Sequence, residues 1–594
     1  MSTTEDRYHW RLEDIFSTEE AWEERFKEIE PVLTALVAYR GNVAESGETL
    51  LEVLRTQDKL GELLEPVVVY AKMRLDEDNR DTLRQQRFDR ALALATRVES
   101  ETAFILPEIL EVPTDTIERY LREVPELRLY ERYLNVLLRR KAHILSADEE
   151  RILALAGEVA ESPDRIFSML NDADLTFPEV TDSQGRSLPL TKGSYTQLLE
   201  SNDRTLRQHA FETLYATYNR LRNTLGATLG AEVRKNLFFS RARHYPSARQ
   251  AALDANEIPE SVYDNLVTSV RSHLDLLHRY VALRKRALGL DQLHMYDLYV
   301  PILQTEQEQI PYERAVQIVK EGLWPLGEEY LRRLDKGLHD RWVDVYEKPG
   351  KTSGAYSWGA YGTHPYVLMN YQGNLDSVFT IAHEMGHAMH TLLSGERQPY
   401  VYSHYVIFVA EVASTVNESL LIQEMLDQTQ EKKRRQTLLN HYLESFRGTL
   451  FRQTMFAEFE AWVHAQAEAG NPPSPEEMSR FYLQLNRDYF GPEVEVDRPI
   501  GLEWARIPHF YMNFYVYQYA TSFAAATTLA QRIRKDPRNQ APAYLEFLSS
   551  GSSKPPLQLL SEAGVDLRTP APIEEALTFF GELLDEMEQL ITDM

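Results

Sequence analysis

The 594-residue sequence contains no cysteine. Disulfide bonds and thiolate metal sites are therefore both excluded, because each needs a cysteine sulfur. A bound transition metal would have to be held by histidine nitrogens and carboxylate oxygens, and the chain has 16 histidines to supply the former. Zinc accepts such ligands.

The sequence also lacks the features of a secreted or membrane protein. Its first residues, MSTTEDR, have neither the basic start nor the apolar core of a secretory signal. No segment is apolar over the length that a membrane helix needs. The net charge of −27 leaves no basic footprint for nucleic acid. We expect a cytoplasmic protein without nucleic-acid or membrane partners, and the choice between monomer and homo-oligomer stays open.

Strand-forming sequence is scarce, and helical signals dominate. Capping-box patterns at 17–20 and 146–149 and an N-cap followed by proline at 474–475 mark helix starts. Amphipathic stretches follow at 21–39 and 149–170. We therefore expect a mostly α-helical fold.

Two short stretches favour β structure. Residues 175–177 and 187–190 flank a turn at 182–185 and predict a hairpin. Residues 354–371 alternate aromatic, small and polar side chains and predict short strands and loops. The hairpin offers the best boundary along the chain. We expect an N-terminal helical region at 1–190 and a catalytic region at 191–594.

The clearest chemical motif is HEMGH at 383–387. Residues four apart share one helical face, so His383 and His387 can bind one ion, and neutral imidazoles suit zinc. Glu384 can take a proton from a zinc-bound water, whose pKa the metal lowers toward neutrality. The motif predicts a zinc site with Glu384 as general base.

Two histidines on a buried helix can instead be ordinary core residues, which is the alternative for the bare motif. Gly386 argues against it, because glycine inside a helix costs about 1 kcal/mol relative to alanine. That cost indicates a close approach by a ligand or another backbone.

The third metal ligand can be sought by elimination. A metzincin site would need a histidine ten positions after His383, where Leu393 stands. A downstream glutamate is the usual alternative. Glu396 lies in a loop-like sequence, whereas Glu411 interrupts an apolar helical run, where a charge is costly unless it is paired or bound to metal. We predict Glu411 as the ligand. Glu418 is either a carboxylate that orients a histidine or a solvated residue.

Further segments accompany the metal motif in a fixed order. They are YHWRLEDIF at 8–16, GAYS at 354–357, LMNY at 368–371, HEMGHAMH at 383–390, SGERQPYVYSHYVIFVAEVASTVNES at 394–419 and IPHFYMNFYVYQY at 507–519. Together they resemble the thimet-oligopeptidase family of metallopeptidases, specifically its oligoendopeptidase F branch, over nearly the whole chain. The resemblance implies a clam-like helical fold with a deep central channel that admits short peptides and excludes folded proteins. It also implies one zinc ion per chain, held at His383, His387 and Glu411, with Glu384 as base.

The same resemblance assigns a role to the aromatic segment 507–519. Attack on a peptide carbonyl builds negative charge on its oxygen, and each donor to that oxygen can contribute roughly 2.7–4 kcal/mol. In the family a histidine and tyrosines provide these donors. The matching residues here are His509, Tyr515 and Tyr517, with Tyr511 in reserve. Phe514 departs from the pattern, which leaves the register open, and the alternative is an aromatic stripe packed in the core.

Residues Gly354, Ala355 and Tyr356, followed by Ser357, are expected to form an edge strand beside the metal. An extended substrate could pair with its free backbone groups, so peptides would be selected by main chain more than by side chain. The alternative is an ordinary edge strand.

These observations predict a zinc-dependent endopeptidase that hydrolyses internal bonds of short oligopeptides. One alternative is an exopeptidase, which needs a fixed group to capture a free chain end. Another is a catalytically silent peptide-binding protein. The presence of all four predicted metal-site residues argues against the latter.

Overall fold

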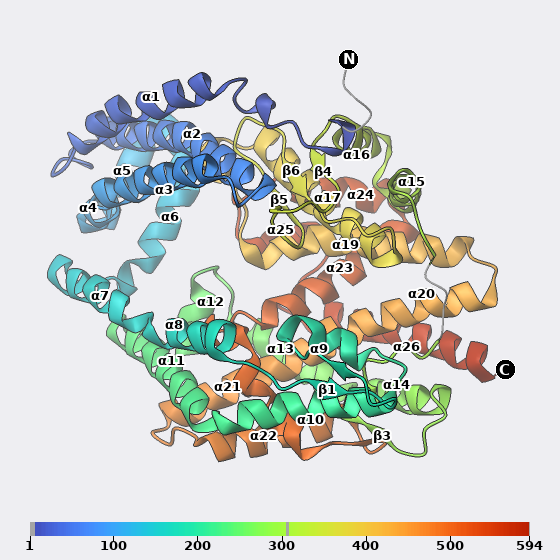
Figure 1. Ribbon diagram of the computed structural model, residues 1–594. Helices are drawn as coiled ribbons and strands as arrows, with labels where there is room; N and C mark the ends of the chain where they lie inside the picture. The colour runs from blue at the N-terminus through green and yellow to red at the C-terminus, as the bar shows by residue number, and fades with distance from the viewer. Residues whose placement is uncertain (1–5, 304–307, 593–594) are drawn as a thin grey trace. The chain divides into compact units, whose positions relative to one another are not determined.

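The computed structural model describes residues 6–303 and 308–592. The fold is mostly α-helical, as predicted, with three small sheets in this part of the chain (Figure 1). The chain divides into two compact units, each built from three separate segments. The first unit comprises 1–144, 307–424 and 529–564, and the second comprises 145–306, 425–528 and 565–594. The predicted boundary at residue 190 separates an N-terminal helical region from a catalytic region. The division into compact units does not test that assignment, which remains a prediction.

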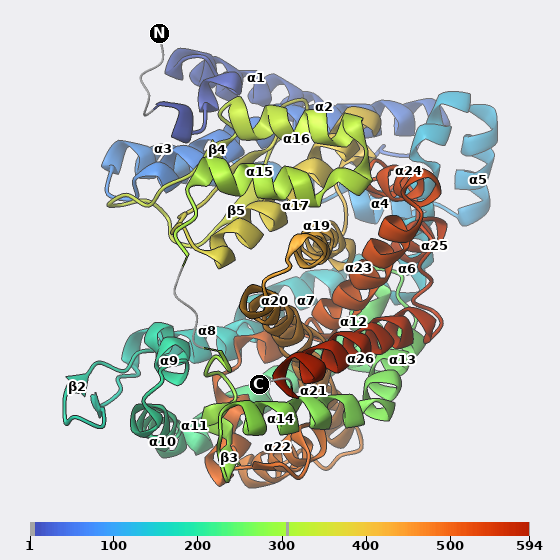
Figure 2. The same ribbon diagram turned by 90° about the vertical axis from the view of Figure 1, so that its right-hand side faces the viewer.

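The first unit begins with helices α1, α2 and α3, which lie side by side (Figure 1). Its helices are α1 (Glu19–Val37), α2 (Gly47–Glu77), α3 (Thr82–Thr102), α4 (Ile105–Glu111), α5 (Thr114–Glu123), α6 (Glu131–Arg140), α15 (Tyr312–Gly322), α16 (Glu328–His339), α17 (Leu375–Arg397), α18 (Tyr400–Ser403), α19 (Ile407–Gln428, which ends in the second unit), α24 (Pro537–Leu548) and α25 (Pro556–Glu562). The N-cap of α1 is Thr18, one residue later than the pattern at 17–20 predicts. Helices α15 and α16 pack on each other, and α15 also packs on α17 (Figure 2).

A three-stranded sheet in the first unit packs on α17. Its order is β4 (Val343–Asp344), β6 (Tyr366–Leu368), β5 (Tyr356–Trp358), with β4 parallel and β5 antiparallel to β6. Strand β5 is therefore an edge strand, as predicted, but it begins at Tyr356. Gly354 and Ala355 precede it, because Gly354 adopts a left-handed backbone with φ of 81° that does not continue a strand.

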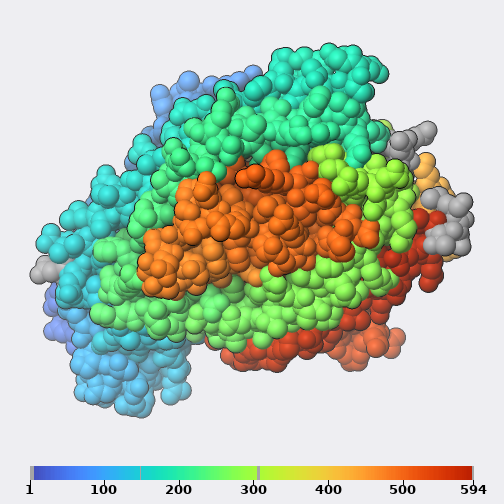
Figure 3. Space-filling model, turned by 90° about the horizontal axis from the view of Figure 1, so that it is seen from below, coloured from blue at the N-terminus to red at the C-terminus, as the bar shows by residue number. Residues whose placement is uncertain are grey.

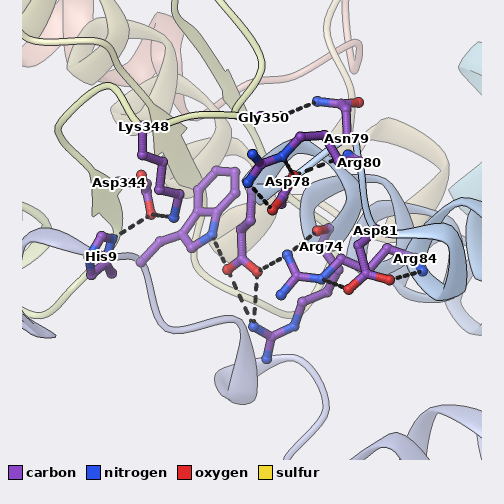
Figure 4. A network of polar contacts seen from close by, with 12 residues as sticks. His9, Arg74, Asp78, Asn79, Arg80, Asp81, Arg84, Asp344, Lys348 and Gly350 are labelled. Carbon is purple, nitrogen blue, oxygen red and sulfur yellow. Dashed lines mark hydrogen bonds and ion pairs between the residues drawn. The ribbon is translucent and has the colours of Figure 1, made fainter.

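The loop between β4 and β5 is held by the amino-terminal segment and the α2–α3 turn (Figure 4). His9 Nδ1 lies 3.1 Å from Asp344 Oδ2, and the Asn79 amide donates to the Gly350 carbonyl at 2.7 Å. The Tyr356 hydroxyl donates to Asp76 of α2 at 2.8 Å. The position of β5 is thus set by residues from the start of the chain.

The second unit is also built mainly of helices. They are α7 (Ala147–Ala160), α8 (Ser162–Ser168), α9 (Lys192–Leu199), α10 (Arg204–Arg220), α11 (Arg222–Ala242), α12 (Ala248–Asp254), α13 (Glu260–Ser272), α14 (Leu274–Ala287), α20 (Lys432–Ser445), α21 (Arg452–Glu468), α22 (Pro475–Phe490), α23 (Tyr517–Lys535, which ends in the first unit) and α26 (Ala571–Thr592). Figure 3 shows the orange segment of α21 and α22 lying between green segments, in agreement with the packing of α22 on α14 and of α21 on α11.

Two predictions for the second unit need correction in detail. The hairpin forms, but its strands are β1 (Val180–Thr181) and β2 (Ser187–Leu188), and 175–177 lie before it. The stretch 149–170 is not one helix, because Pro163 starts a new one, α8, which continues into a π-helical turn at Met169–Asp174.

A second short pair of strands, β3 (Leu293–His294) with β7 (Val494–Glu495), is parallel. The capping box at Ser146 is confirmed, as is the N-cap at Ser474 followed by Pro475. Within the described residues, no helix combines the length and apolarity that crossing a membrane requires.

Candidate functional site

Two neighbouring helices of the first unit carry the predicted metal-site residues. Helix α17 starts after Asn374, whose side chain accepts the Ser377 amide at 2.9 Å, and holds the HEMGH motif in its middle. Helix α19 carries Glu411 and, seven residues later, Glu418. Both pairs, the two histidines and the two glutamates, lie on the facing sides of their helices.

The geometry of His383, His387 and Glu411 fits one small cation. Glu411 Oε2 lies 3.5 Å from His383 Nε2 and 3.7 Å from His387 Nε2. Zinc bonds of about 2.0–2.2 Å at tetrahedral angles would place ligand atoms about 3.3–3.6 Å apart. In the described part of the chain, this is the only group of three His, Asp or Glu residues whose ligand atoms lie within 4.8 Å of one another.

Glu418 contacts the first histidine from the opposite side. Its Oε1 lies 3.2 Å from His383 Nδ1, which leaves Nε2 to face Glu411. Burial lowers the pKa of His383, but the hydrogen bond and charge of Glu418, together with the charges of Glu384 and Glu411, outweigh it and raise that pKa to about 9. Three carboxylates around two imidazoles form a surplus of negative charge that a divalent cation would balance.

Glu384 is buried beside this cluster, with 7% of its surface exposed. Burial, with the charges of Glu411 and Glu418, raises the pKa of its carboxyl to about 7. Its Oε2 has no hydrogen-bond partner among the described residues. A buried carboxylate oxygen without a partner is costly, so this atom indicates a place where a water or ligand is bound.

Gly386 permits the close approach of α17 and α19. A Cβ at this position would lie 2.6 Å from Ser414 Cα and 2.7 Å from the Ala413 carbonyl oxygen. The close approach to Gly386 that the sequence predicted is therefore made by the backbone of α19. Asn417 of α19 strengthens it by donating to the Ala382 carbonyl at 3.0 Å.

Gly386→Ala is expected to push α17 away from α19 and weaken zinc binding, because the methyl group would overlap with fixed backbone atoms. Such overpacking typically costs about 1–3 kcal/mol of stability. Thermal unfolding and zinc competition with a chelator would measure both effects. Gly395→Ala on the same helix is the control, since nothing lies within 4 Å of its added Cβ. Equal zinc affinity in both variants would contradict the prediction.

The predicted oxyanion donors lie in the second unit, around the start of α23. His509, in the 3₁₀ turn Pro508–Tyr511, stacks against Tyr515 with ring centroids 6.0 Å apart. Burial, and then the charge of Arg452, lower the pKa of His509, so its imidazole is neutral at pH 7 and keeps one N–H donor. The structure thus brings His509 and Tyr515 together.

Tyr517 and Tyr511 lie elsewhere in the same unit. The Tyr517 ring is 2% exposed and packs against Tyr263 at 5.1 Å, while Tyr511 stacks on Phe167 and its hydroxyl lies 3.0 Å from Thr228 Oγ1. Both rings are packed in the core, which agrees with the alternative interpretation of this segment as an aromatic stripe in the core. A direct role for Tyr517 remains a prediction.

Tyr519 was missed from the sequence, although its hydroxyl lies 3.4 Å from His509 Nε2 and its ring 5.3 Å from that of Tyr515. Helical spacing gives no signal for this pair, because Tyr519 lies in the first turn of α23 whereas Tyr515 precedes that helix.

Glu460 of α21 holds the turn between His509 and Tyr515. Asn513 and Phe514 both have positive φ, at 39° and 58°, a strained conformation for residues with side chains. The Phe514 amide donates to Glu460 Oε1 at 2.7 Å. Burial raises the pKa of Glu460 to about 8, so its carboxyl is mostly protonated at pH 7. Sequence patterns carry no signal for this contact between distant segments.

Glu460→Ala is expected to destabilise the protein by about 1–3 kcal/mol, because it leaves the buried Phe514 amide without an acceptor. Glu460→Gln keeps an acceptor and removes the titration. Since the folded pKa is raised, the contribution of Glu460 to stability is full below its unfolded pKa and is lost as pH rises through about 8. Between pH 5 and 9, the unfolding temperature of the wild type should therefore fall relative to that of Glu460→Gln, and the difference should grow as the pH rises. Parallel curves would contradict this expectation.

Comparison with known proteins places the chain among peptidases. It matches the model of peptidase family M3 over residues 197–579 and that of oligopeptidase F over residues 108–177. Oligopeptidase PepF of Bacillus subtilis is 47% identical over 582 residues, covering 98% of this chain and 87% of that protein. The structure of oligoendopeptidase-F from Enterococcus faecium matches with a TM-score of 0.76 and 38% identity over 97% of this chain and 100% of that one. The structure of a candidate peptidase from Chlamydophila abortus matches with a TM-score of 0.92 and 36% identity over 98% of each chain.

Proposed function

Because the chain belongs to peptidase family M3, in its oligoendopeptidase F branch, we propose that it is a zinc-dependent enzyme that hydrolyses internal bonds of short oligopeptides. Its action as a peptidase on oligopeptides follows from the family. The observation that carries the finer proposal is the cluster of His383, His387 and Glu411 beside the unpartnered oxygen of Glu384.

In this proposal His383, His387 and Glu411 hold one zinc ion. Zinc at this position would polarise the peptide carbonyl and lower the pKa of the attacking water. Glu418 fixes the ring of His383 through Nδ1, so that Nε2 stays directed toward the ion.

Glu384 acts as the general base. Its pKa near neutrality suits a group that takes a proton from the attacking water and returns it to the leaving amine. The free Oε2 is the atom available for this transfer, because no described residue occupies it. Burial keeps the carboxylate in one place, which lowers the cost of aligning it for proton transfer.

We assign the stabilisation of the developing oxyanion to His509 and Tyr515, and retain Tyr517 as a predicted member of the set. A neutral imidazole and a phenol both donate hydrogen bonds, as this role requires. Tyr519 contacts His509 and orients its ring.

The free edge of β5 is the proposed substrate-binding strand, with Gly354 and Ala355 leading into it. A Cβ added at Gly354 would meet no atom within 4 Å, so a second backbone can approach on that side. Tyr356 uses its hydroxyl to hold the strand on Asp76, so its part in binding would be through the main chain.

Mass spectrometry of free and end-blocked peptides about 5–20 residues long would test the proposal. The zinc-loaded enzyme should cut both kinds internally, and a chelator should abolish the cuts. Trimming of free-ended peptides alone would support an exopeptidase instead. Zinc binding without any cleavage would support a peptide-binding protein, and failure to bind zinc would overturn the proposed metal centre.

A further inference from the structure

A small cavity lies inside the second unit, among helices α9, α10, α21 and α22 and the 3₁₀ segment Arg498–Arg506. Its volume is about 20 Å³, which is room for roughly one water-sized sphere. Most of its wall is aromatic or aliphatic, but three arginines, one glutamate and one asparagine also line it: Arg447, Arg452, Arg506, Glu503 and Asn486. The lining therefore has more positive than negative groups.

Glu503 is already used by two of these arginines. Its Oε1 accepts hydrogen bonds from Arg452 at 2.6 Å and from Arg506 at 3.0 Å, and its Oε2 accepts one from the Tyr482 hydroxyl at 2.7 Å. One buried carboxylate thus serves two guanidinium groups.

Glu444, behind the cavity wall, is shared in the same way. It accepts hydrogen bonds from Arg447 at 2.6 Å and from Arg284 at 2.8 Å. Arg447 is 5% exposed and Arg284 is 1% exposed. Each of the four arginines pairs with a carboxylate, but only two carboxylates serve all four, so these six residues carry a net charge of +2. Buried charges are normally compensated, because an uncompensated charge is expensive to remove from water.

Three polar atoms of the cavity wall also lack partners. Arg506 Nε and the hydroxyl of Tyr215, a residue 2% exposed, make no hydrogen bond of acceptable geometry with a described residue, although the Arg506 guanidinium lies near that hydroxyl. Both of these groups can donate a proton, whereas the third atom, Asn486 Oδ1, is an amide oxygen that only accepts. The wall thus offers unused donors and surplus positive charge around a space of ionic size.

We propose that this cavity binds one monovalent inorganic anion, a halide such as chloride. The volume is that of about one water-sized sphere and so favours a halide over phosphate or an organic anion, and the guanidinium groups with the Tyr215 hydroxyl provide donors suited to a halide. A water molecule would fill the same space and accept the hydrogen bonds, but it would leave the net charge at +2, whereas one halide lowers it to +1. The site uses none of the residues proposed for catalysis, so it does not depend on the proposed function.

Thermal unfolding of the purified full-length protein in sodium bromide, sodium chloride or sodium gluconate at equal ionic strength would test binding. Gluconate is too large for the cavity and controls for general salt effects. The unfolding temperature should rise with halide concentration, because an anion that binds only the folded state stabilises it. Bromide should also give an anomalous scattering peak in the cavity of a crystal.

Tyr215→Phe removes one donor while keeping the ring, and it should weaken the apparent halide affinity about tenfold or more, as expected for a hydrogen bond to a charged group. Tyr312→Phe is the matched control, since Tyr312 is another buried tyrosine, in the first unit, whose hydroxyl has no partner among the described residues. Its halide response should equal that of the wild type. Identical unfolding curves in bromide and gluconate, together with a cavity free of anomalous signal, would overturn the proposal in favour of a water-filled space.

Discussion

Glu384→Gln is expected to lower kcat by about 10²–10⁴-fold while zinc content stays unchanged, since general-base catalysis contributes about that much. Glutamine has nearly the same shape as glutamate but cannot take the proton at Oε2. Because Glu384 is not one of the three residues of the metal cluster, the substitution leaves the donor set intact. Initial rates on an internally quenched peptide and metal analysis of the same sample would measure both quantities.

Glu396→Gln provides the matched control on the same helix, because α17 continues to Arg397 and the loop that the sequence suggested around Glu396 does not form. Glu396 is half-exposed and pairs with Arg333, so its loss should change kcat by less than about twofold and stability by about 0–1 kcal/mol. If Glu384→Gln retained wild-type kcat, another group would have to be the base. Loss of zinc from Glu384→Gln would instead show that the carboxylate supports the metal.

Glu411→Ala is expected to abolish stoichiometric zinc binding. Complete four-ligand zinc sites bind with about 10–16 kcal/mol, so an average ligand accounts for about 3 kcal/mol, or more than 100-fold in affinity. Removing Glu411 also takes away the group that lies opposite both histidine Nε2 atoms. Activity should fall in parallel and should recover partly at high zinc concentration.

Glu418→Gln, on the same helix, should behave differently from Glu411→Ala. It can still hydrogen-bond His383 Nδ1 but carries no charge, so zinc affinity should fall by about 10–100-fold and the site should still fill with excess metal. Equilibrium dialysis against graded chelator would separate the two variants. Equal affinities for both would show that Glu418 is a ligand or that Glu411 is not one.

Local spacing allowed much of the metal cluster to be predicted. His383 and His387 face one point because a helix repeats every 3.6 residues, and Gly386 indicated a close neighbour before that neighbour was known. Glu411 could be singled out because a charge in an apolar run requires a partner. The helical class followed from capping and amphipathic patterns. Cytoplasmic location and the absence of nucleic-acid or membrane partners remain predictions.

Features that depend on distant segments could not be predicted in this way. The hydrogen bond from Phe514 to Glu460 joins residues 54 apart, and no periodicity reports it. The position of β5 depends on the anchoring of Tyr356 to Asp76, which lies in α2. Tyr519 joins Tyr515 and His509 across the start of α23, where helical spacing does not apply, and the family resemblance pointed to Tyr517.

The core around α1, α2 and α3 has a consequence for synthesis of the chain. Residues from Trp10 to Leu137 form most of this core, but Ala360, Tyr366 and Leu368 complete it. At about 5–20 residues per second, a ribosome adds those last residues roughly 10–45 s after Leu137. The first helices must therefore remain incompletely packed during that interval, with apolar surface open to chaperones. A nascent chain halted before residue 360 should be held by them rather than released as a folded domain.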